Sequence, residues 1–233
     1  MIKKIEYNNL GRNTQPSWLN SHFHFSFAEY YNPQNINFGA LRVVNDDLVQ
    51  PGRGFTPHPH QNMEIVSYVI EGELSHADSM GNKHTLVRGN VQYMSAGTGV
   101  VHSEMNDSDK ILRFFQIWIL PDADSHTPNY GDYRFTYEDR HNKLLQMVSS
   151  KSGDAPIKIN QDMNIYNSEL DKDNTLSFNI GKDRQAYIVN AEGSIKVNDV
   201  VLNHGDAAEI VEENIEIKAE ENSLFVILEM AKA

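Results

Sequence analysis

The chain has 233 residues, and 32 acidic against 20 basic side chains give it a formal net charge of −12. This charge, together with the lack of any run of basic residues, excludes the electrostatic attraction on which binding to nucleic acid or to an anionic membrane depends. There is no cysteine, so disulfides, thiolate metal sites and thiol nucleophiles are excluded, and any metal must be held by histidine, carboxylate or neutral oxygen ligands.

The N-terminal sequence MIKKIEYNNL contains no long apolar segment and is not typical of a signal peptide. The most apolar run elsewhere, Phe114 to Leu120, is far shorter than the ~20 residues that a membrane-spanning helix needs. The sequence therefore predicts a cytoplasmic protein that does not insert into a membrane.

Short apolar segments separated by turn residues follow one another along the first half, which is typical of β-strands. The segment Ala40 to Val44 is expected to end at Asn45-Asp46-Asp47, and the segment Glu64 to Ile70 at Glu71-Gly72. Further strands are predicted at 91–94, 100–102 and 112–120, and no amphipathic helix stands out. The pattern predicts an all-β fold, either a sandwich or a barrel.

The composition changes between His126 and Arg140, where the chain is polar, aromatic and rich in turn residues. We interpret this segment as the connection between two domains, residues 1–135 and 136–233. Strand-sized segments then resume at Ile157–Ile159, Leu176–Ile180, Ala186–Val189, Ile195–Val197, Ile215–Ile217 and Leu224–Leu228.

The two halves resemble each other faintly. Ser67 to Leu74 is similar to Ala186 to Ile195, and each segment is a strand followed by a turn and a second strand. A duplicated β-barrel would explain this similarity, although two unrelated series of hairpins would also produce it.

Two short motifs place metal-type ligands on separate strands. In HPHQNME, His58 and His60 are two residues apart, so on a strand both imidazoles point to the same face. In VVHSEMN, His102 and Glu104 have the same spacing. Three imidazoles and one carboxylate suit iron, manganese, nickel, cobalt, copper or zinc, and leave room for water, substrate or dioxygen.

The chain contains a second His-x-His pair, His22 and His24, which has no partner cluster elsewhere. These two histidines alternate with phenylalanines, so a structural or pocket-lining role is favoured over metal binding. The remaining histidines lie in polar or turn surroundings and are predicted to face solvent: His76, His84, His126, His141 and His204.

The motif spacing resembles that of the cupin superfamily, whose first motif is a glycine, five residues, His-x-His, three or four residues and a glutamate. Here these positions are Gly52, His58, His60 and Glu64, and the second motif is similar from Gly89 to Asn106, with Ser95 in place of the usual proline and a longer gap before His102. The segments GFTPHPHQNMEIVSYVIEGE and MSAGTGVVHSE resemble one cupin branch, the pirin family, and the resemblance is dense over residues 16–120.

The resemblance implies a bicupin, meaning two jelly-roll-like β-barrel domains, with metal bound only in the N-terminal one. It implies His58, His60, His102 and Glu104 as ligands of one divalent transition metal, with iron(II) expected and zinc, manganese, nickel, cobalt or copper as alternatives. Glu64, a ligand in many other cupins, is then left without that role. The domain 136–233 has neither motif and is predicted to lack metal ligands.

Some bacterial members of the family are similar to quercetin 2,3-dioxygenase, which opens a flavonol with dioxygen and releases carbon monoxide. This implies a small aromatic substrate such as a flavonol, Glu104 as the favoured general base and Glu64 as the reserve candidate. Phe55, Met63 and Tyr68 are pocket candidates, although core packing would suit each equally well. The alternatives are a non-catalytic, metal- and redox-dependent regulatory protein acting through protein partners, and a cupin that keeps its metal for stability.

Overall fold

The computed structural model describes residues 1–13 and 16–232 and divides into two compact units. The N-terminal unit comprises Gly11–Phe135 with Ile159–Gln161, and the C-terminal unit comprises Met1–Leu10, Thr136–Lys158 and Asp162–Ala233. The division predicted from the sequence, at residue 135, does not include the assignment of Met1–Leu10 to the C-terminal unit or of Ile159–Gln161 to the N-terminal unit.

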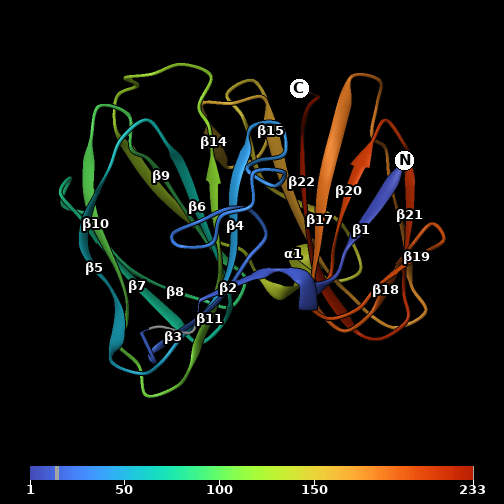
Figure 1. Ribbon diagram of the computed structural model, residues 1–233, viewed down its shortest axis with the longest axis horizontal. Coiled ribbons are helices and arrows are strands. Elements are labelled where there is room, and N and C mark those ends of the chain that lie inside the picture. The colour runs from blue at the N-terminus through green and yellow to red at the C-terminus, as the bar shows by residue number, and fades with distance from the viewer. Residues whose placement is uncertain (14–15, 233) are drawn as a thin grey trace. The chain divides into compact units, whose positions relative to one another are not determined.

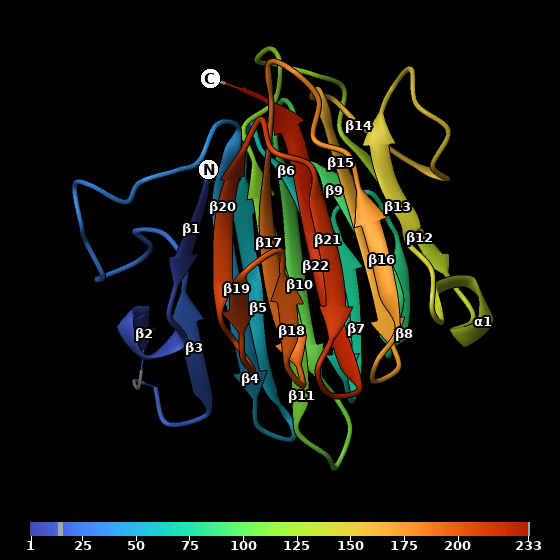
Figure 2. The same ribbon diagram turned by 90° about the vertical axis from the view of Figure 1, so that its right-hand side faces the viewer.

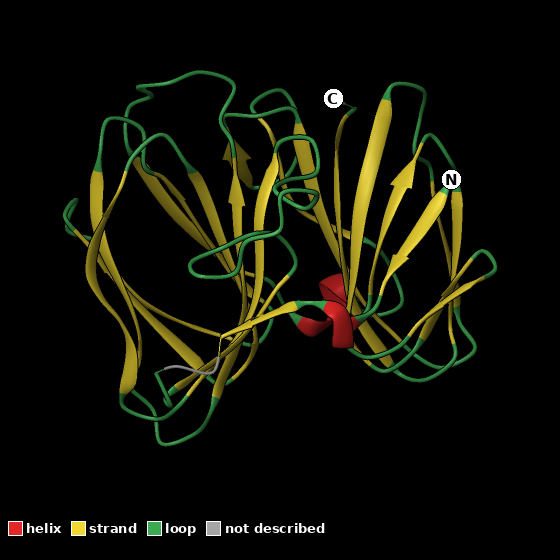
Figure 3. Ribbon diagram, in the orientation of Figure 1, coloured by secondary structure: helices red, strands yellow, loops and turns green. Residues whose placement is uncertain are grey.

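Nearly all the regular structure is β-strand (Figure 3), so the predicted all-β class is confirmed. The helical elements of the described residues are a 3₁₀ helix η1 (Tyr7–Asn9) and a single-turn helix α1 (Tyr137–Arg140). No helix in the described part of the chain is long and apolar enough to cross a membrane.

The N-terminal unit contains two antiparallel sheets, with strand orders β12-β9-β6-β11-β4-β3-β2 and β5-β10-β7-β8 (Figure 1). Apolar side chains that include Val69, Leu74, Leu86 and Phe114 form a buried core cluster drawn from both sheets. The strands are β2 (Gly11–Asn13), β3 (Leu19–Phe23), β4 (Leu41–Val49), β5 (Arg53–His60), β6 (Glu64–Glu71), β7 (Glu73–Asp78), β8 (Lys83–Val87), β9 (Asn90–Ser95), β10 (Val100–Asn106), β11 (Leu112–Ile119) and β12 (Asn129–Arg134).

The C-terminal unit is built in the same way, with sheet orders β1-β20-β17-β22-β15-β13-β14 and β16-β21-β18-β19 (Figure 2). Its core is a larger apolar cluster that includes Ile188, Ile217 and Phe225. The strands are β1 (Ile2–Ile5), β13 (Leu145–Ser150), β14 (Ile157–Ile159), β15 (Met163–Leu170), β16 (Thr175–Phe178), β17 (Arg184–Glu192), β18 (Ile195–Val197), β19 (Val200–Leu202), β20 (Ala207–Val211), β21 (Ile215–Ala219) and β22 (Ser223–Ala231).

The sheet orders of the two units correspond strand by strand, which supports a duplicated domain. The run β9-β6-β11-β4 in one unit matches β20-β17-β22-β15 in the other, and β5-β10-β7-β8 matches β16-β21-β18-β19. The faint similarity between 67–74 and 186–195 therefore joins equivalent strand pairs, β6–β7 and β17–β18.

Strand β4 differs from its prediction in a way that matters for the site. It does not end at Asn45-Asp46-Asp47 but continues to Val49, paired throughout with β11 and, from Asn45 onward, with β3. Asparagine and aspartate are disfavoured in strands, which is why the sequence predicts that the strand ends at these residues. The prediction is wrong, because β4 continues through them to Val49.

The predicted connection at 126–140 also contains more structure than expected. Residues Asn129–Arg134 form β12, which pairs antiparallel with β9 from Asn129↔Ser95 to Arg134↔Asn90. The interpretation of the whole segment as a linker is therefore wrong, because its first half completes the larger sheet of the N-terminal unit.

Candidate metal centre

Strands β5 and β10 bring together the three histidines of the two motifs. The strands pair antiparallel with His58 opposite His102, and the register shifts between this pair and the next, Glu104 opposite Phe55. Such β-bulges commonly re-aim side chains next to active sites. Ligand nitrogens of His58, His60 and His102 all lie within 4.8 Å of one another, so the pairing of these strands makes one cluster from two separate sequence motifs.

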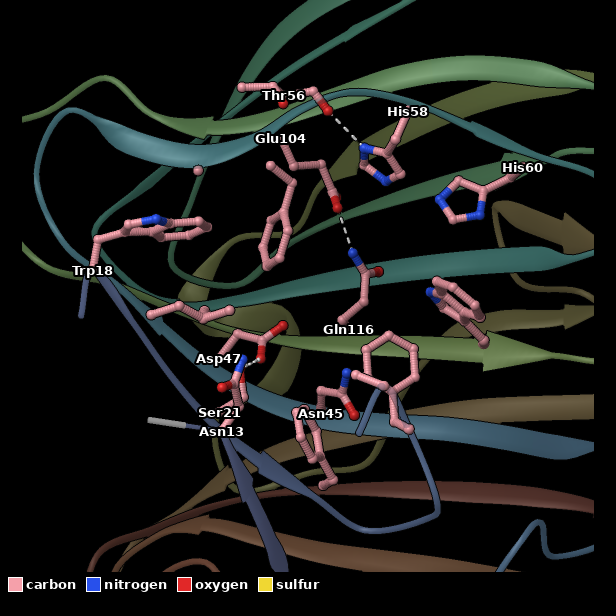
Figure 4. A pocket seen from close by; sticks show the side chains of 17 residues that line it. Asn13, Trp18, Ser21, Asn45, Asp47, Thr56, His58, His60, Glu104 and Gln116 are labelled. Atoms are coloured by element: carbon pink, nitrogen blue, oxygen red, sulfur yellow. Dashed lines mark hydrogen bonds between the residues drawn. The ribbon is translucent and has the colours of Figure 1, made fainter. Parts of the chain in front are cut away.

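The orientation of His58 is set by its own strand. Its Nδ1 lies 2.7 Å from the backbone carbonyl oxygen of Thr56, to which the protonated Nδ1 donates. A hydrogen bond of this kind fixes the tautomer and leaves Nε2 with a free lone pair. Thr56 is thus a positioning residue for His58 through its backbone alone (Figure 4).

Glu104 lies on the same strand as His102 and is held by three neutral donors from the facing sheet. Ser67 Oγ and Gln92 Nε2 donate to Glu104 Oε1 at 2.7 and 2.5 Å, and Gln116 Nε2 donates to Oε2. Ser67 is the direct cross-strand partner of both glutamine residues. A single row across β9, β6 and β11 therefore holds this buried carboxylate beside the histidines.

The charge state and hydrogen bonding of the histidines fit a metal ion. His102 is almost fully buried, and neither of its ring nitrogens has a hydrogen-bond partner among the described residues. Burial, followed by the neighbouring His58 and His76, lowers the pKa of His102 to about 3, and burial with His102 and His58 lowers that of His60 to about 4. Neutral imidazoles with unpartnered nitrogens are costly in a protein interior but suited to ligating a divalent transition metal.

His76 is a member of this cluster that the sequence analysis missed. It is 1% exposed, so the prediction that it faces solvent is wrong. A ligand atom of His76 lies within 4.8 Å of those of His102 and Glu104, and the ring stacks on Tyr130 with centroids 4.5 Å apart. Its Nε2 contacts Asp78 Oδ2 at 3.0 Å, whereas its Nδ1 has no partner in the described region. His76 lies two residues from Leu74 on β7, so strand alternation places both side chains inward.

Glu64 is not brought to the histidines. Its buried carboxylate accepts hydrogen bonds of 2.6 Å from Tyr93 Oη and from Ser95 Oγ. It also accepts bonds from the backbone and side-chain amides of Asn160, which belongs to the N-terminal unit. Glu64 and Ser67 are three apart on β6 and therefore point to opposite faces. The reserve catalytic role predicted for Glu64 finds no support in this geometry, and its local role is to join three segments.

The other histidines lie outside the cluster. His22 and His24 are buried, in line with a structural role, and burial is the first cause that lowers the pKa of His24 to about 4. Neither lines the cavity beside the metal centre. The remaining four are at least partly exposed, as predicted: His84, His126, His141 and His204.

A cavity of about 450 Å³ opens beside the centre, with His58, His60, Glu104 and Gln116 in its wall (Figure 4). This volume is in the range of small-molecule sites. Of the three predicted pocket residues, Phe55 lines the cavity, whereas Tyr68 is fully buried in the core and Met63 packs in a separate apolar cluster. Five aromatic side chains supply much of the apolar lining: Trp18, Phe23, Phe27, Phe55 and Trp118.

Comparison with known proteins identifies the family. The model of the Pirin family matches residues 6–119, and that of the quercetinase C-terminal cupin domain matches residues 146–230. A pirin-like protein from Caulobacter vibrioides is 42% identical over 233 residues, covering 99% of this chain and 100% of the relative. The chain belongs to the pirin family. Its predicted bicupin architecture is thereby confirmed.

Two proteins of Escherichia coli extend the comparison. The quercetin 2,3-dioxygenase of Escherichia coli K12 is 40% identical over 215 residues, covering 91% of this chain and 92% of that enzyme. The crystal structure of the bacterial pirin YhhW from Escherichia coli in complex with nickel(II) has a TM-score of 0.93 and 37% identity, and both chains are covered completely.

Proposed function

We propose that this pirin is a metal-dependent dioxygenase of the quercetin 2,3-dioxygenase type, which opens a flavonol with dioxygen and releases carbon monoxide. The observation that carries the proposal is that His58, His60 and Glu104, which belong to the histidine and glutamate cluster, lie in the wall of an aromatic-lined cavity. The names of the related proteins support the same activity.

We propose His58, His60, His102 and Glu104 as the ligands of one divalent transition metal. Iron(II) is our expected ion, and the nickel(II) complex of YhhW supports the binding of a divalent first-row metal. A bound ion would supply Lewis acidity, which lowers the pKa of a hydroxyl that binds to it. The second domain is proposed to bind no metal, so the expected stoichiometry is one ion per chain.

The side chains around the centre have separate tasks. Glu104 is the proposed general base and accepts the proton of the substrate hydroxyl at a carboxylate oxygen, while Ser67, Gln92 and Gln116 hold that carboxylate in place. The aromatic lining binds the flat faces of the substrate and excludes water from the reacting end.

The test is metal analysis of the purified protein, followed by an aerobic assay with quercetin in which carbon monoxide is measured. We expect turnover by the loaded protein and its loss in Glu104→Gln with metal still bound. Glu73→Gln, the same change at an exposed position of β7, is the matched control and is expected to retain turnover. Loss in Glu64→Gln with activity kept in Glu104→Gln would reverse the assignment of the base.

Absence of turnover with every first-row metal, in protein that binds the metal, would refute the dioxygenase proposal. That result would favour the non-catalytic alternative, in which the metal-loaded protein acts through a protein partner.

A further inference from the structure

The polar residues that fail to end β4 alternate between its two faces. Asp46 points away from the cavity and forms a buried bidentate ion pair with Arg113, whose Nε and Nη2 lie 2.9 and 2.7 Å from its carboxylate oxygens. Asn45 and Asp47 point the other way and line the cavity together with Ser21 of β3. The ion pair explains Asp46, but it does not explain two further polar side chains on the inner face.

The inner pair includes one acceptor, on Asn45, that lacks a donor. Asp47 is 2% exposed, and its Oδ1 accepts a hydrogen bond of 2.5 Å from Ser21 Oγ. Asn45 is 3% exposed, and its Oδ1 has no hydrogen-bond partner among the described residues. A buried acceptor without a donor is unfavourable, and replacing both residues with apolar ones would remove the cost. Two polar side chains in an otherwise aromatic-lined cavity point to a ligand that brings donors.

The positions of Asn45 and Asp47 in the cavity determine which part of a ligand must carry the hydrogen-bond donors. Asn45 is the direct cross-strand partner of Gln116, whose amide holds Glu104, so it lies roughly 5 Å beyond Gln116, one strand spacing. Asp47 lies about 7 Å further along β4, at two residues' rise. In Figure 4, Asp47 and Ser21 lie on the side of the cavity away from His58 and His60. The cavity therefore has one polar end at the histidines and another at β4.

We propose that Asn45 and Asp47 form a subsite that binds the hydroxyl groups of a planar, polyhydroxylated aromatic ligand at the end remote from the histidines. This inference rests on the proposed function, which supplies the substrate class. It adds that the hydroxyl groups recognised by Asn45 and Asp47 are those at the end of the ligand remote from the histidines. Asn45 Oδ1 and a carboxyl oxygen of Asp47 each accept one phenolic O–H, and Ser21 holds the carboxyl group of Asp47 in position. No covalent change occurs at this subsite.

The test compares two flavonols in metal-loaded protein without dioxygen, so that binding is measured without turnover. Quercetin carries two hydroxyls on its remote ring, and galangin is the same flavonol without them. We expect wild type to bind quercetin at least about tenfold more tightly than galangin. In Asp47→Leu and in Asn45→Leu, the ratio of the quercetin affinity to the galangin affinity should fall towards one. The galangin affinity and the metal content should stay as in wild type.

Asp46→Asn is the matched control on the neighbouring residue. It weakens the ion pair with Arg113 and lowers stability, but it should leave the ratio of the two affinities unchanged. Equal affinities in wild type, a ratio that persists in both leucine variants, or failure of both flavonols to bind would overturn the proposal. The protein could also prefer quercetin in a way that depends on Asp47 and yet release no carbon monoxide in the aerobic assay. That result would support the subsite and refute the dioxygenase reaction.

Discussion

Replacing Asp47 with asparagine should stabilise the metal-free protein above neutral pH. Burial raises the pKa of Asp47 from its usual 3.8 to about 7, with Ser21 opposing the rise and the charges of Asp46 and Glu104 adding to it. The folded state then holds a proton between pH 4 and 7 that the unfolded chain has released, so stability falls as pH increases through this window and levels off above it. At about 1.4 kcal/mol per pKa unit, the ionised carboxylate costs the wild type about 4 kcal/mol at pH 8, an order-of-magnitude figure.

The assay is urea denaturation of wild type and Asp47→Asn between pH 4 and 8. Because every other titrating group is common to both proteins, its contribution cancels in the difference between their free energies of unfolding. This difference should be near zero at pH 4, increase up to pH 7, and then stay constant at about 2–4 kcal/mol in favour of the variant. A difference that does not vary with pH, or a wild type that is more stable than the variant at pH 8, would refute the argument that Asp47 is buried without a compensating positive charge.

Three further predictions concern the centre and its support. His102→Ala should abolish metal binding in calorimetric titration and His24→Ala should not, and loss of metal in the latter would mean that the wrong His-x-His pair has been chosen. His76→Phe should weaken metal binding by about 10- to 100-fold without abolishing it, whereas unchanged affinity would make His76 a core residue only. Gly97→Ala should lower the free energy of unfolding, measured by urea denaturation, by more than about 2 kcal/mol. The reason is that φ of Gly97 is +43° and a Cβ would lie 1.9 Å from the carbonyl oxygen of His126. A variant as stable as the wild type would contradict this.

The grouping of the histidines follows from the sequence because it depends only on strand geometry. His58 with His60, and His102 with Glu104, each have the two-residue spacing that places side chains on one face. What spacing alone cannot supply is the pairing of β5 with β10, which makes one site from the two motifs. The resemblance to the pirin family implies the four residues of both motifs as ligands of one metal, and the register of these two strands supplies the physical reason.

The features that the sequence did not predict depend on contacts between distant segments. The side chains of Asn45 and Asp47 favour turns and so predict the end of a strand, and only the pairing with β3 and β11 overrides that preference. The polar neighbours of His76 predict an exposed side chain, whereas its alternation with Leu74 on β7 places it on the buried face. The place of Glu64 in the motif predicts a role at the centre, whereas its hydrogen bonds to Asn160 come from a segment 96 residues away.

One of these residues, Asn45, belongs to a polar row that crosses the larger sheet. Gln92, Ser67, Gln116 and Asn45 are successive cross-strand partners on β9, β6, β11 and β4, so one polar row crosses an inner face that strand alternation would otherwise fill with apolar side chains. The first three of these residues are in contact with Glu104, and the fourth opens on the cavity. Because the sheet fixes their spacing, the same backbone that orients the carboxylate at the centre also sets its distance from Asn45. A mutation that shifts β4 relative to β11 is therefore expected to change both the geometry at Glu104 and the length of ligand that the cavity accepts.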